Sequence, residues 1–271
     1  MRLKSVSKLN LCLHIVGRRP DGWHLLETVI DPIDWGDELR LRRRHDGRII
    51  RRHGMGSVPP EQDLVLRAAR LLQTQSACRF GADISLRKRV PHGAGLGGGS
   101  GDAALALVEL NRLWRLHWPR ERLARLALQL GADVPALLVP QPYFATGIGE
   151  QLQPICLPPR HYVVIFPGQP MATQNMYQDP DLERSAPGIS ARQFDPERHQ
   201  HNSFQSLAER RQPQIRAALD YLRAMQCPNA RLTGSGSAVF AECASREQAR
   251  AVARACPAGW TARAVRSVRG R

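Results

Sequence analysis

The residues with the clearest chemical meaning lie between Pro91 and Ala104, in the stretch Pro-His-Gly-Ala-Gly-Leu-Gly-Gly-Gly-Ser-Gly-Asp-Ala-Ala. Five of the seven residues from 93 to 99 are glycine, and residues without a Cβ let backbone N–H groups approach a ligand closely. The alanine-rich run at 103–108 predicts a helix, so these N–H groups sit at a helix N-terminus, where the macrodipole favours an anion. The stretch therefore predicts a polyphosphate site.

Other nucleotide-binding patterns fit this stretch less well. Gly93, Gly95 and Gly98 satisfy the G-x-G-x-x-G pattern of a dinucleotide fold, but that fold needs a nearly continuous apolar strand beforehand, and residues 83–89 alternate and are basic. The P-loop pattern needs a lysine after the glycines, and none follows. A flexible glycine linker is a further alternative. It is less favoured because a predicted helix follows the glycines directly.

The stretch resembles the phosphate loop of the GHMP kinases, a family that includes galactokinase, homoserine kinase, mevalonate kinase and phosphomevalonate kinase. Two further segments match that family: Gly131-Ala-Asp-Val-Pro135 resembles the motif with the catalytic aspartate, and residues 231–237 (Arg-Leu-Thr-Gly-Ser-Gly-Ser) resemble the third, glycine-rich motif. The resemblance implies a small-molecule kinase that uses ATP and magnesium to phosphorylate a hydroxyl group.

One branch of the family is more similar than the others. It acts on 4-diphosphocytidyl-2-C-methyl-D-erythritol, a cytidine diphosphate-linked methylerythritol, in the non-mevalonate isoprenoid precursor pathway. Its motifs resemble Lys8-Leu-Asn-Leu11, residues 17–24 (Gly-Arg-Arg-Pro-Asp-Gly-Trp-His), the triple glycine at 97–99 and residues 130–135, in this order. A GHMP kinase of the mevalonate or homoserine type remains the alternative.

The resemblance implies that Asp133 is the catalytic carboxylate and Lys8 its basic neighbour. A carboxylate can accept the proton of the attacking hydroxyl, and an ammonium can stabilise the developing negative charge. The resemblance also implies that Asn10, Asp133 and Thr173 contact the methylerythritol end or its diphosphate. Without the resemblance, two structural alternatives remain. Asp133 could cap a helix that begins at Val-Pro, and Lys8 could be a solvated strand lysine.

The nucleotide is expected along the whole glycine-rich stretch: Pro91, His92, Gly93, Ala94, Gly95, Leu96, Gly97, Gly98, Gly99, Ser100 and Gly101. The resemblance implies that the Ser100 hydroxyl binds either a phosphate or magnesium, and it leaves the other magnesium ligands unknown. The family usually has a second serine at the next position, where this chain has Gly101. This departure removes one hydroxyl contact and leaves the backbone role of the loop intact.

A cytosine site is implied by three further residues. Trp23 and Tyr177 match the two aromatics that sandwich the ring in the related kinases, and His24 matches the histidine that hydrogen-bonds its edge. Trp23 replaces the tyrosine expected there and keeps the stacking face. A base stacked on an aromatic side chain contributes about 1–3 kcal/mol. The structural alternatives are a core residue for Trp23 and a loop aromatic for Tyr177.

The elements that must position these residues follow from hydrophobic periodicity and turn signals. Strands are predicted near residues 8–16, 25–33, 38–42, 82–87, 162–166 and 238–243, with a hairpin turn at 17–22. Helices are predicted near residues 64–72, 102–114, 119–130, 215–225 and 246–256, and a long loop at 178–201. Strands and helices mix without a strict β-α-β rhythm, which predicts an α+β fold.

The resemblance makes this fold a two-lobed GHMP fold with the active site in the interlobe cleft. A proline-rich segment at residues 152–159 suggests the boundary, so we expect an N-terminal ATP-binding GHMP domain at 1–152 and a C-terminal GHMP domain at 153–271.

Composition narrows the class of protein. The chain is 42% hydrophobic and 23% charged, as globular proteins are. Its net charge of +15 raises nucleic-acid binding as an alternative, but no aromatic residues interleave with the arginine clusters as a stacking surface would require. Only three of its 39 basic residues are lysines: Lys4, Lys8 and Lys88.

Neither a signal peptide nor a run of roughly 18 apolar residues is present, and the six cysteines are scattered without metal-ligand spacing. We therefore expect a cytoplasmic protein with reduced cysteines, no specific nucleic-acid partner and no membrane partner, present as a monomer or a homodimer.

Overall fold

The structure is a computed structural model that describes residues 2–53 and 58–270. The chain forms two compact units, and each unit contains several separate segments of the sequence. Unit 1 comprises residues 1–7, 35–90 and 97–140, and unit 2 comprises residues 8–34, 91–96 and 141–271. The division into family domains at 1–152 and 153–271 stays a prediction.

Unit 1 contains a four-stranded sheet in the order β1 (Arg2–Lys4), β4 (Glu38–Arg44), β6 (Gly81–Arg87) and β5 (Ile49–His53). Strand β4 pairs antiparallel with both neighbours, whereas β5 runs parallel to β6. In β6, Ala82, Ile84 and Leu86 are buried, as period-two alternation requires of a sheet covered on one face.

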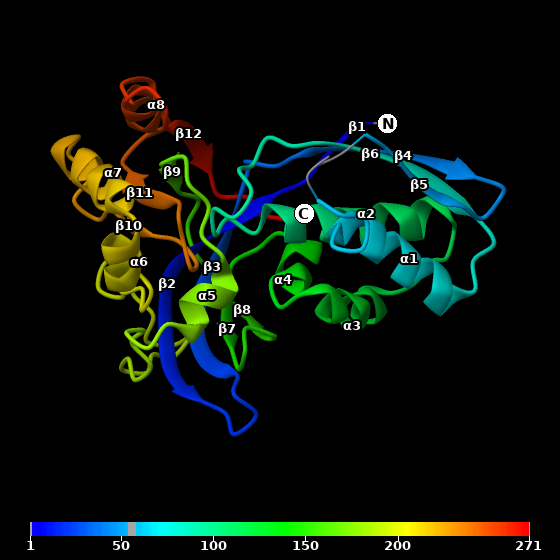
Figure 1. Cartoon of the computed structure of the whole chain (residues 1–271), viewed down its shortest axis with the longest axis horizontal. Helices are drawn as coiled ribbons and strands as arrows, with labels where there is room; N and C mark the ends of the chain where they lie inside the picture. The colour runs from blue at the N-terminus through cyan, green and yellow to red at the C-terminus, as the bar shows by residue number, and fades with distance from the viewer. Residues whose placement is uncertain (1, 54–57, 271) are drawn as a thin grey trace. The chain divides into compact units, whose positions relative to one another are not determined.

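The helices in the described part of unit 1 are α1 (Leu64–Ser76), α2 (Gly98–Leu113), α3 (Arg120–Leu130) and α4 (Val134–Leu138). Figure 1 shows α1 and α2 side by side against the sheet. Their buried side chains, such as Leu66, Leu72 and Leu107, form one apolar core with Leu39 and Ile84 of the strands. The Asp63 carboxylate begins α1 by accepting the N–H groups of its first turn.

Unit 2 contains two four-stranded sheets. The first has the order β2 (Ser7–Arg18), β3 (His24–Ile33), β7 (Tyr143–Thr146) and β8 (Gln151–Pro154). The second has the order β10 (Arg231–Leu232), β11 (Val239–Cys243), β9 (His161–Phe166) and β12 (Thr261–Arg266). Strand β9 pairs antiparallel with β11 and β12, and β2 and β3 form the predicted hairpin around residues 19–23.

The helices of unit 2 are α5 (Thr173–Gln178), α6 (Gln205–Arg211), α7 (Pro213–Ala224) and α8 (Arg246–Arg254). Figure 1 shows α7 and α8 against the second sheet. Leu219, Leu222 and Val252 of these helices share a core with Val163 and Ile165 of β9. Between Gln178 and Gln205 the chain forms no helix or multi-residue strand, which confirms the predicted loop.

The predicted α+β class is confirmed, as are the predicted helices and strands. One helix begins earlier than expected: α2 starts at Gly98 rather than Asp102, because Gly97 adopts a φ of +64° and the chain is helical from the next residue. The additional elements include short strands, the short helices α4, α5 and α6, and β12, whose arginines obscure its alternation.

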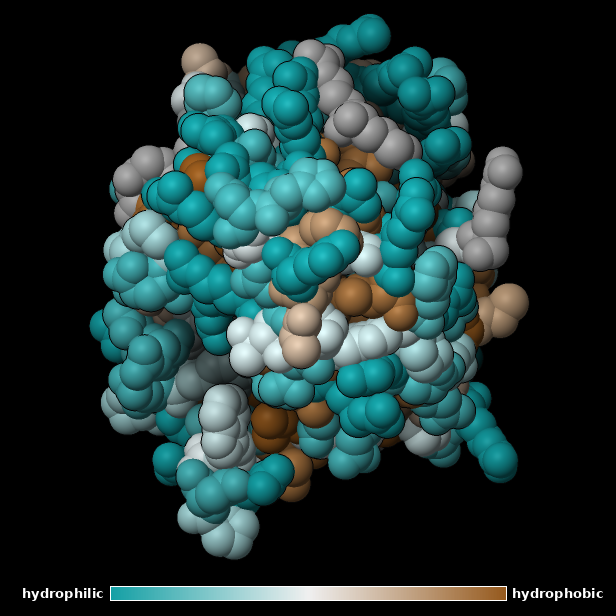
Figure 2. All heavy atoms as spheres, turned by 90° about the vertical axis from the view of Figure 1, so that its right-hand side faces the viewer, coloured by the Kyte–Doolittle hydropathy of each residue, from teal (hydrophilic) through white to brown (hydrophobic). Residues whose placement is uncertain are grey.

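Figure 2 shows a mostly hydrophilic surface on the side of the molecule that is turned to the right in Figure 1. Among the residues drawn in colour, apolar surface on this side is confined to small separate areas, unlike the broad patches used in protein or membrane contacts. No helix in residues 2–53 and 58–270 has the length and hydropathy needed to cross a membrane. All six cysteines are free, and Cys12, Cys227 and Cys243 are buried.

Candidate active site

The first half of the glycine-rich loop packs against the third motif within unit 2. Gly93 and Gly95 have φ angles of +66° and +75°, which side-chain-bearing residues rarely adopt. A Cβ on Gly95 would lie 2.4 Å from the carbonyl oxygen of Thr233. The Ala238 N–H donates to the carbonyl of Ala94 over 3.0 Å. Glycine at 95 is therefore required both by the backbone angle and by the neighbouring chain.

The third motif has the matching requirement. Gly234 has a φ of +57°, and a Cβ there would lie 2.8 Å from the carbonyl oxygen of Gly95. The Asn202 side-chain amide donates to the carbonyls of Leu232 and Gly234, both over 3.0 Å, and so holds this segment from its other side. The two glycine-rich motifs thus meet backbone to backbone.

Lys8 is buried beside this junction, with 4% of its surface exposed. Its backbone N–H donates to the carbonyl of Leu96 over 2.9 Å, and its Nζ donates to Oδ1 of Asn10 over 2.6 Å. Burying an ammonium is costly unless it has polar partners, and the Asn10 amide oxygen is such a partner. The alternative of a solvated strand lysine is wrong.

Asn10 connects Lys8 to the third motif. Its backbone N–H donates to Oγ1 of Thr233 over 2.9 Å, and its Nδ2 donates to Oγ1 of Thr28 over 2.8 Å. These bonds fix the amide so that Oδ1 faces Lys8. Thr173 also reaches this motif, with its Oγ1 2.8 Å from Oγ of Ser235. Unit 2 thus brings together the first half of the loop, Lys8, Asn10 and Thr173.

The second half of the loop belongs to unit 1 and begins α2. The Gly101 N–H makes an intrahelical bond of 2.9 Å to the carbonyl of Gly97. The N–H groups of Gly98, Gly99 and Ser100 precede it and have no intrahelical acceptor, as in the first turn of any helix. Such N–H groups at the positive end of the helix dipole can bind phosphate oxygens.

Close packing explains why residue 101 is glycine. A Cβ there would lie 1.9 Å from the carbonyl oxygen of Val6, so a serine cannot occupy this backbone position. The departure from the family pattern is thus a consequence of how α2 contacts the N-terminal segment of unit 1.

A buried ion cluster supports the start of α2 within unit 1. Lys88 Nζ donates to Oδ2 of Asp102 over 2.9 Å and also to the Asp37 carboxylate. Asp37 Oδ1 accepts the Val90 N–H over 2.8 Å, and Oδ1 of Asp102 accepts the Ser5 hydroxyl over 2.7 Å. No local sequence pattern predicts this cluster; the one signal is that Lys88 is one of only three lysines in an arginine-rich chain.

Burial and mutual attraction set the protonation of this cluster. Burial raises the pKa of the Asp102 carboxyl, with the nearby Asp37 charge acting in the same direction and Lys88 opposing it. Burial alone would lower the pKa of Lys88, but the Asp102 and Asp37 carboxylates outweigh it and raise that pKa. The ammonium therefore stays charged and compensates the two buried acids.

Asp133 directly precedes α4 and is half-buried. It occupies the N-cap position of that helix, as the helix-cap alternative predicts, but its carboxylate makes no capping hydrogen bond to the first turn. Asp133 belongs to unit 1 and Lys8 to unit 2, and their joint catalytic action stays a prediction.

Trp23 lies in the turn between β2 and β3, where its carbonyl accepts the Arg19 N–H over 2.7 Å. Its surface is 61% exposed, whereas large apolar residues in the core are almost fully buried. The alternative that Trp23 is a core residue is therefore wrong.

His24 and Tyr177 are in contact within unit 2, with ring centroids 5.1 Å apart. Tyr177 lies on α5 rather than in a loop, and its ring meets Phe204 edge to face at 4.9 Å. The loop-aromatic alternative for Tyr177 is therefore wrong. Phe204 is fully buried and gives the tyrosine a rigid support.

Arg184 fixes this histidine. Its Nε donates to Nε2 of His24 over 3.2 Å, and its Nη2 donates to the carbonyls of Tyr177 and Asp179. Burial lowers the pKa of His24, and the charges of Arg184 and Arg18 lower it further. His24 is thus neutral at neutral pH with its proton on Nδ1. No sequence signal links Arg184 to His24, because 160 positions separate them.

Comparisons with known proteins identify the family of the chain. Residues 63–140 match the GHMP kinases N terminal domain, and residues 185–262 match the GHMP kinases C terminal domain. The 4-diphosphocytidyl-2-C-methyl-D-erythritol kinase of Ralstonia nicotianae is 50% identical over 261 residues, covering 95% of this chain and 90% of that relative. The chain belongs to this kinase family. The enzyme of that name from Chromobacterium violaceum is 51% identical, covering 90% and 86%.

Solved structures add evidence on the fold. A crystal structure of 4-(cytidine 5'-diphospho)-2C-methyl-D-erythritol kinase is similar with a TM-score of 0.86 and 33% identity, covering all of both chains. The homoserine kinase of Cytophaga hutchinsonii has a TM-score of 0.67 at 16% identity, covering 99% and 95%, which shows a shared fold alone. This family member is an ATP-dependent small-molecule kinase with the two-part GHMP fold.

Replacing Gly95 tests the junction of the two glycine-rich motifs. We expect Gly95→Ala to lower the free energy of unfolding by about 2 kcal/mol or more, because the new Cβ meets the Thr233 carbonyl at a strained φ. Urea denaturation measures this change. Gly99→Ala is the matched control for stability, since its Cβ would meet only Leu64 at 3.5 Å. Equal stability of the two variants would contradict the packing argument.

Replacing Lys88 tests the buried ion cluster. We expect Lys88→Met to lower the free energy of unfolding by about 3–5 kcal/mol at pH 8, because two buried carboxylates lose their counter-ion. The cost should shrink at pH 5: burial raises the pKa of the Asp102 carboxyl, and the variant loses the opposing Lys88 charge, so the variant gains more stability than the wild type from protonation as the pH falls.

Arg89→Met is the control for Lys88→Met. This substitution breaks a 2.8 Å ion pair between Arg89 and Glu38. Because the Arg89 side chain is 40% exposed, the free energy of unfolding should fall by less than about 1 kcal/mol. Urea denaturation at pH 5 and pH 8 measures the free energy of unfolding of the wild type and of both variants. A larger loss for Lys88→Met at pH 5 than at pH 8 would refute the assigned compensation.

Proposed function

We propose that this chain transfers the γ-phosphate of ATP to a hydroxyl of 4-diphosphocytidyl-2-C-methyl-D-erythritol, in the non-mevalonate isoprenoid precursor pathway. The observation that carries the proposal is the near full-length 50% identity to a kinase named for this substrate. The cytosine residues support it, since a mevalonate or homoserine kinase has no use for them.

The cytosine ring binds at Trp23, His24 and Tyr177. The exposed indole of Trp23 offers a stacking face, and Tyr177 offers a second aromatic surface that Phe204 holds rigidly. Neutral His24 can hydrogen-bond the edge of the base, with its Nε2 already engaged by Arg184 and its Nδ1–H as donor. A neutral ring suits an uncharged base better than a cation would.

In the transfer step, the Asp133 carboxylate accepts the proton of the substrate hydroxyl. The hydroxyl oxygen forms a bond to the γ-phosphorus while the bond from that phosphorus to the β–γ bridging oxygen breaks, and ADP leaves. Lys8 Nζ, whose direction is fixed by Asn10, stabilises negative charge on the reacting groups. Thr173 contacts the substrate, and Asn10 acts on it through Lys8.

The nucleotide phosphates bind along Pro91–Gly101, chiefly to backbone N–H groups. Magnesium accompanies ATP: it is typically held by phosphate oxygens, water and one or two protein oxygens. The described residues contain no group of three or more His, Cys, Asp or Glu able to hold a metal by themselves, which fits an ion held mainly by the nucleotide. Ser100 Oγ, in the first turn of α2, is the protein ligand we assign.

We place the reaction in the cytoplasm, whose reducing conditions suit the six free cysteines.

An assay with the purified chain tests the function directly. ATP turnover should be found with the cytidine diphosphate-linked substrate and not with mevalonate or homoserine. Preference for either of the latter would overturn the assigned substrate and leave the kinase class intact.

Asp133→Asn tests the assigned base. We expect kcat to fall by about 10² to 10⁴-fold, the contribution of a positioned general base, while ATP affinity measured by calorimetry is retained. Asp220→Asn removes an exposed carboxylate from α7 and serves as control, with kcat unchanged within about twofold. Near-normal kcat for Asp133→Asn would remove this residue from its role.

Trp23→Ala tests the stacking face. The KM for the cytidine-linked substrate should rise about 5- to 100-fold with kcat little changed, since stacking contributes about 1–3 kcal/mol to binding. Trp23→Tyr should restore most of the affinity. Leu128→Ala, which truncates another exposed large apolar residue, is the control with normal KM. An unaltered KM for Trp23→Ala would show that the indole does not contact the base.

A further inference from the structure

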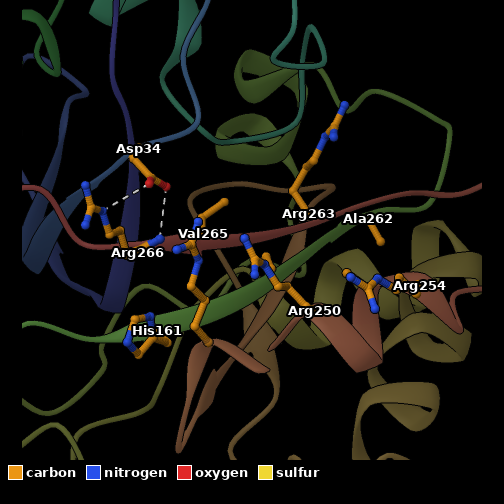
Figure 3. Close-up of a pocket in the computed structure, with 11 residues that line it drawn as sticks. Asp34, His161, Arg250, Arg254, Ala262, Arg263, Val265 and Arg266 are labelled. Atoms are coloured by element: carbon orange, nitrogen blue, oxygen red, sulfur yellow. Dashed lines mark hydrogen bonds and ion pairs between the residues drawn. The ribbon is translucent and has the colours of Figure 1, made fainter. Parts of the chain in front are cut away.

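A pocket of about 340 Å³ lies between α8 and β12 in unit 2 (Figure 3). None of the residues assigned above to ATP, substrate or catalysis lines it. Five arginines and one carboxylate, that of Asp34, are among its lining residues. The arginines are Arg246, Arg250, Arg254, Arg263 and Arg266. A concave surface of this size is typical of sites for small ligands.

Three of these arginines come from one face of α8. Arg246, Arg250 and Arg254 are four residues apart, so their side chains are neighbours along the helix, and like charges at this spacing destabilise it. Within residues 2–53 and 58–270 none of the three forms an ion pair at salt-bridge distance. The nearby Glu247 is engaged first by its own backbone N–H and by the Ser245 hydroxyl, which lower its pKa, and the charges of Arg250 and His161 act on it in the same direction.

Strand β12 supplies a floor of short side chains and one oriented guanidinium. Ala262 and Ala264 lie opposite α8 and leave room between the arginines. Arg266 is held at the other end, where its Nε lies 3.3 Å from Oδ2 of Asp34 and its backbone N–H donates to Oδ1 over 3.0 Å. Figure 3 shows Arg250 and Arg254 along the strand and Arg263 pointing away from them.

We infer that this pocket binds a small anion with two or more linked phosphoryl groups, at a site separate from the glycine-rich loop. Guanidinium groups are planar forks whose N–H groups match phosphate oxygens in pairs, and several of them lining one pocket suit a compact polyphosphate. The lining contains no Trp, Tyr or Phe, so it lacks the stacking surface of a single-strand nucleic-acid site. The buried Nδ1 of His161, which has no hydrogen-bond partner among the described residues, adds a polar group to the same lining.

Hydrogen exchange of the full chain with sodium tripolyphosphate tests the inference at about 0.15 M NaCl, where non-specific attraction is screened. We expect protection of residues 246–266 in the wild type. In Arg250→Gln/Arg254→Gln, the concentration needed for this protection should rise at least about tenfold, while protection of residues 93–101 is unchanged. Arg250→Lys, which keeps the charge and loses the fork, should fall between them.

The control is Arg70→Gln/Arg125→Gln, which removes two exposed helix arginines of unit 1 and the same net charge. It should bind like the wild type. The inference is overturned if residues 246–266 gain no protection, or if the control loses as much affinity as the pocket variant. It is also overturned if a 20-nucleotide single-stranded RNA protects the segment more strongly than tripolyphosphate does, since the site would then be a nucleic-acid surface.

Discussion

The candidate site depends on the close approach of two glycine-rich backbones. Gly95 and Gly234 stand so near each other's segment that a Cβ on either would collide with a carbonyl oxygen. This contact fixes the path of the loop from Gly93 to Leu96, and the same third motif accepts the Asn10 N–H through Thr233. Two physical reasons therefore favour glycine in this loop: access of a ligand to the backbone, and the packing of one chain segment on another.

The second half of the loop depends on a different interaction. At the start of α2, an ammonium between two buried carboxylates ties the strand that precedes the loop to the helix that follows it. A buried cluster of this kind is a poor source of net stability, but it is costly to leave incomplete, so it favours one arrangement strongly over others. The N–H groups that we assign to the phosphates are thus supported by the ion cluster and, through Gly101, by direct backbone packing against Val6.

Charge is used in opposite ways in the two regions that we assign to ligands. At the residues that we assign to the base, burial lowers the pKa of His24 and the charges of Arg184 and Arg18 lower it further, so that a neutral ring is available to an uncharged base. Along α8, Arg246, Arg250 and Arg254 outnumber the nearby acids Glu247 and Asp34, and this excess of positive charge suits a polyanion. The high arginine content of the chain therefore serves more than one purpose, and composition alone does not distinguish them.

The sequence by itself determined the phosphate loop, the family and the type of each long element, because glycine spacing and apolar periodicity are local signals. It also supplied Lys8, Trp23, His24 and Tyr177 through ordered motifs. Only the tertiary structure decided that Lys8 is buried against Asn10, that Gly101 packs on Val6, that Lys88 contacts Asp102 and that Arg184 donates to His24. These depend on contacts between residues far apart in the chain, which no local pattern records.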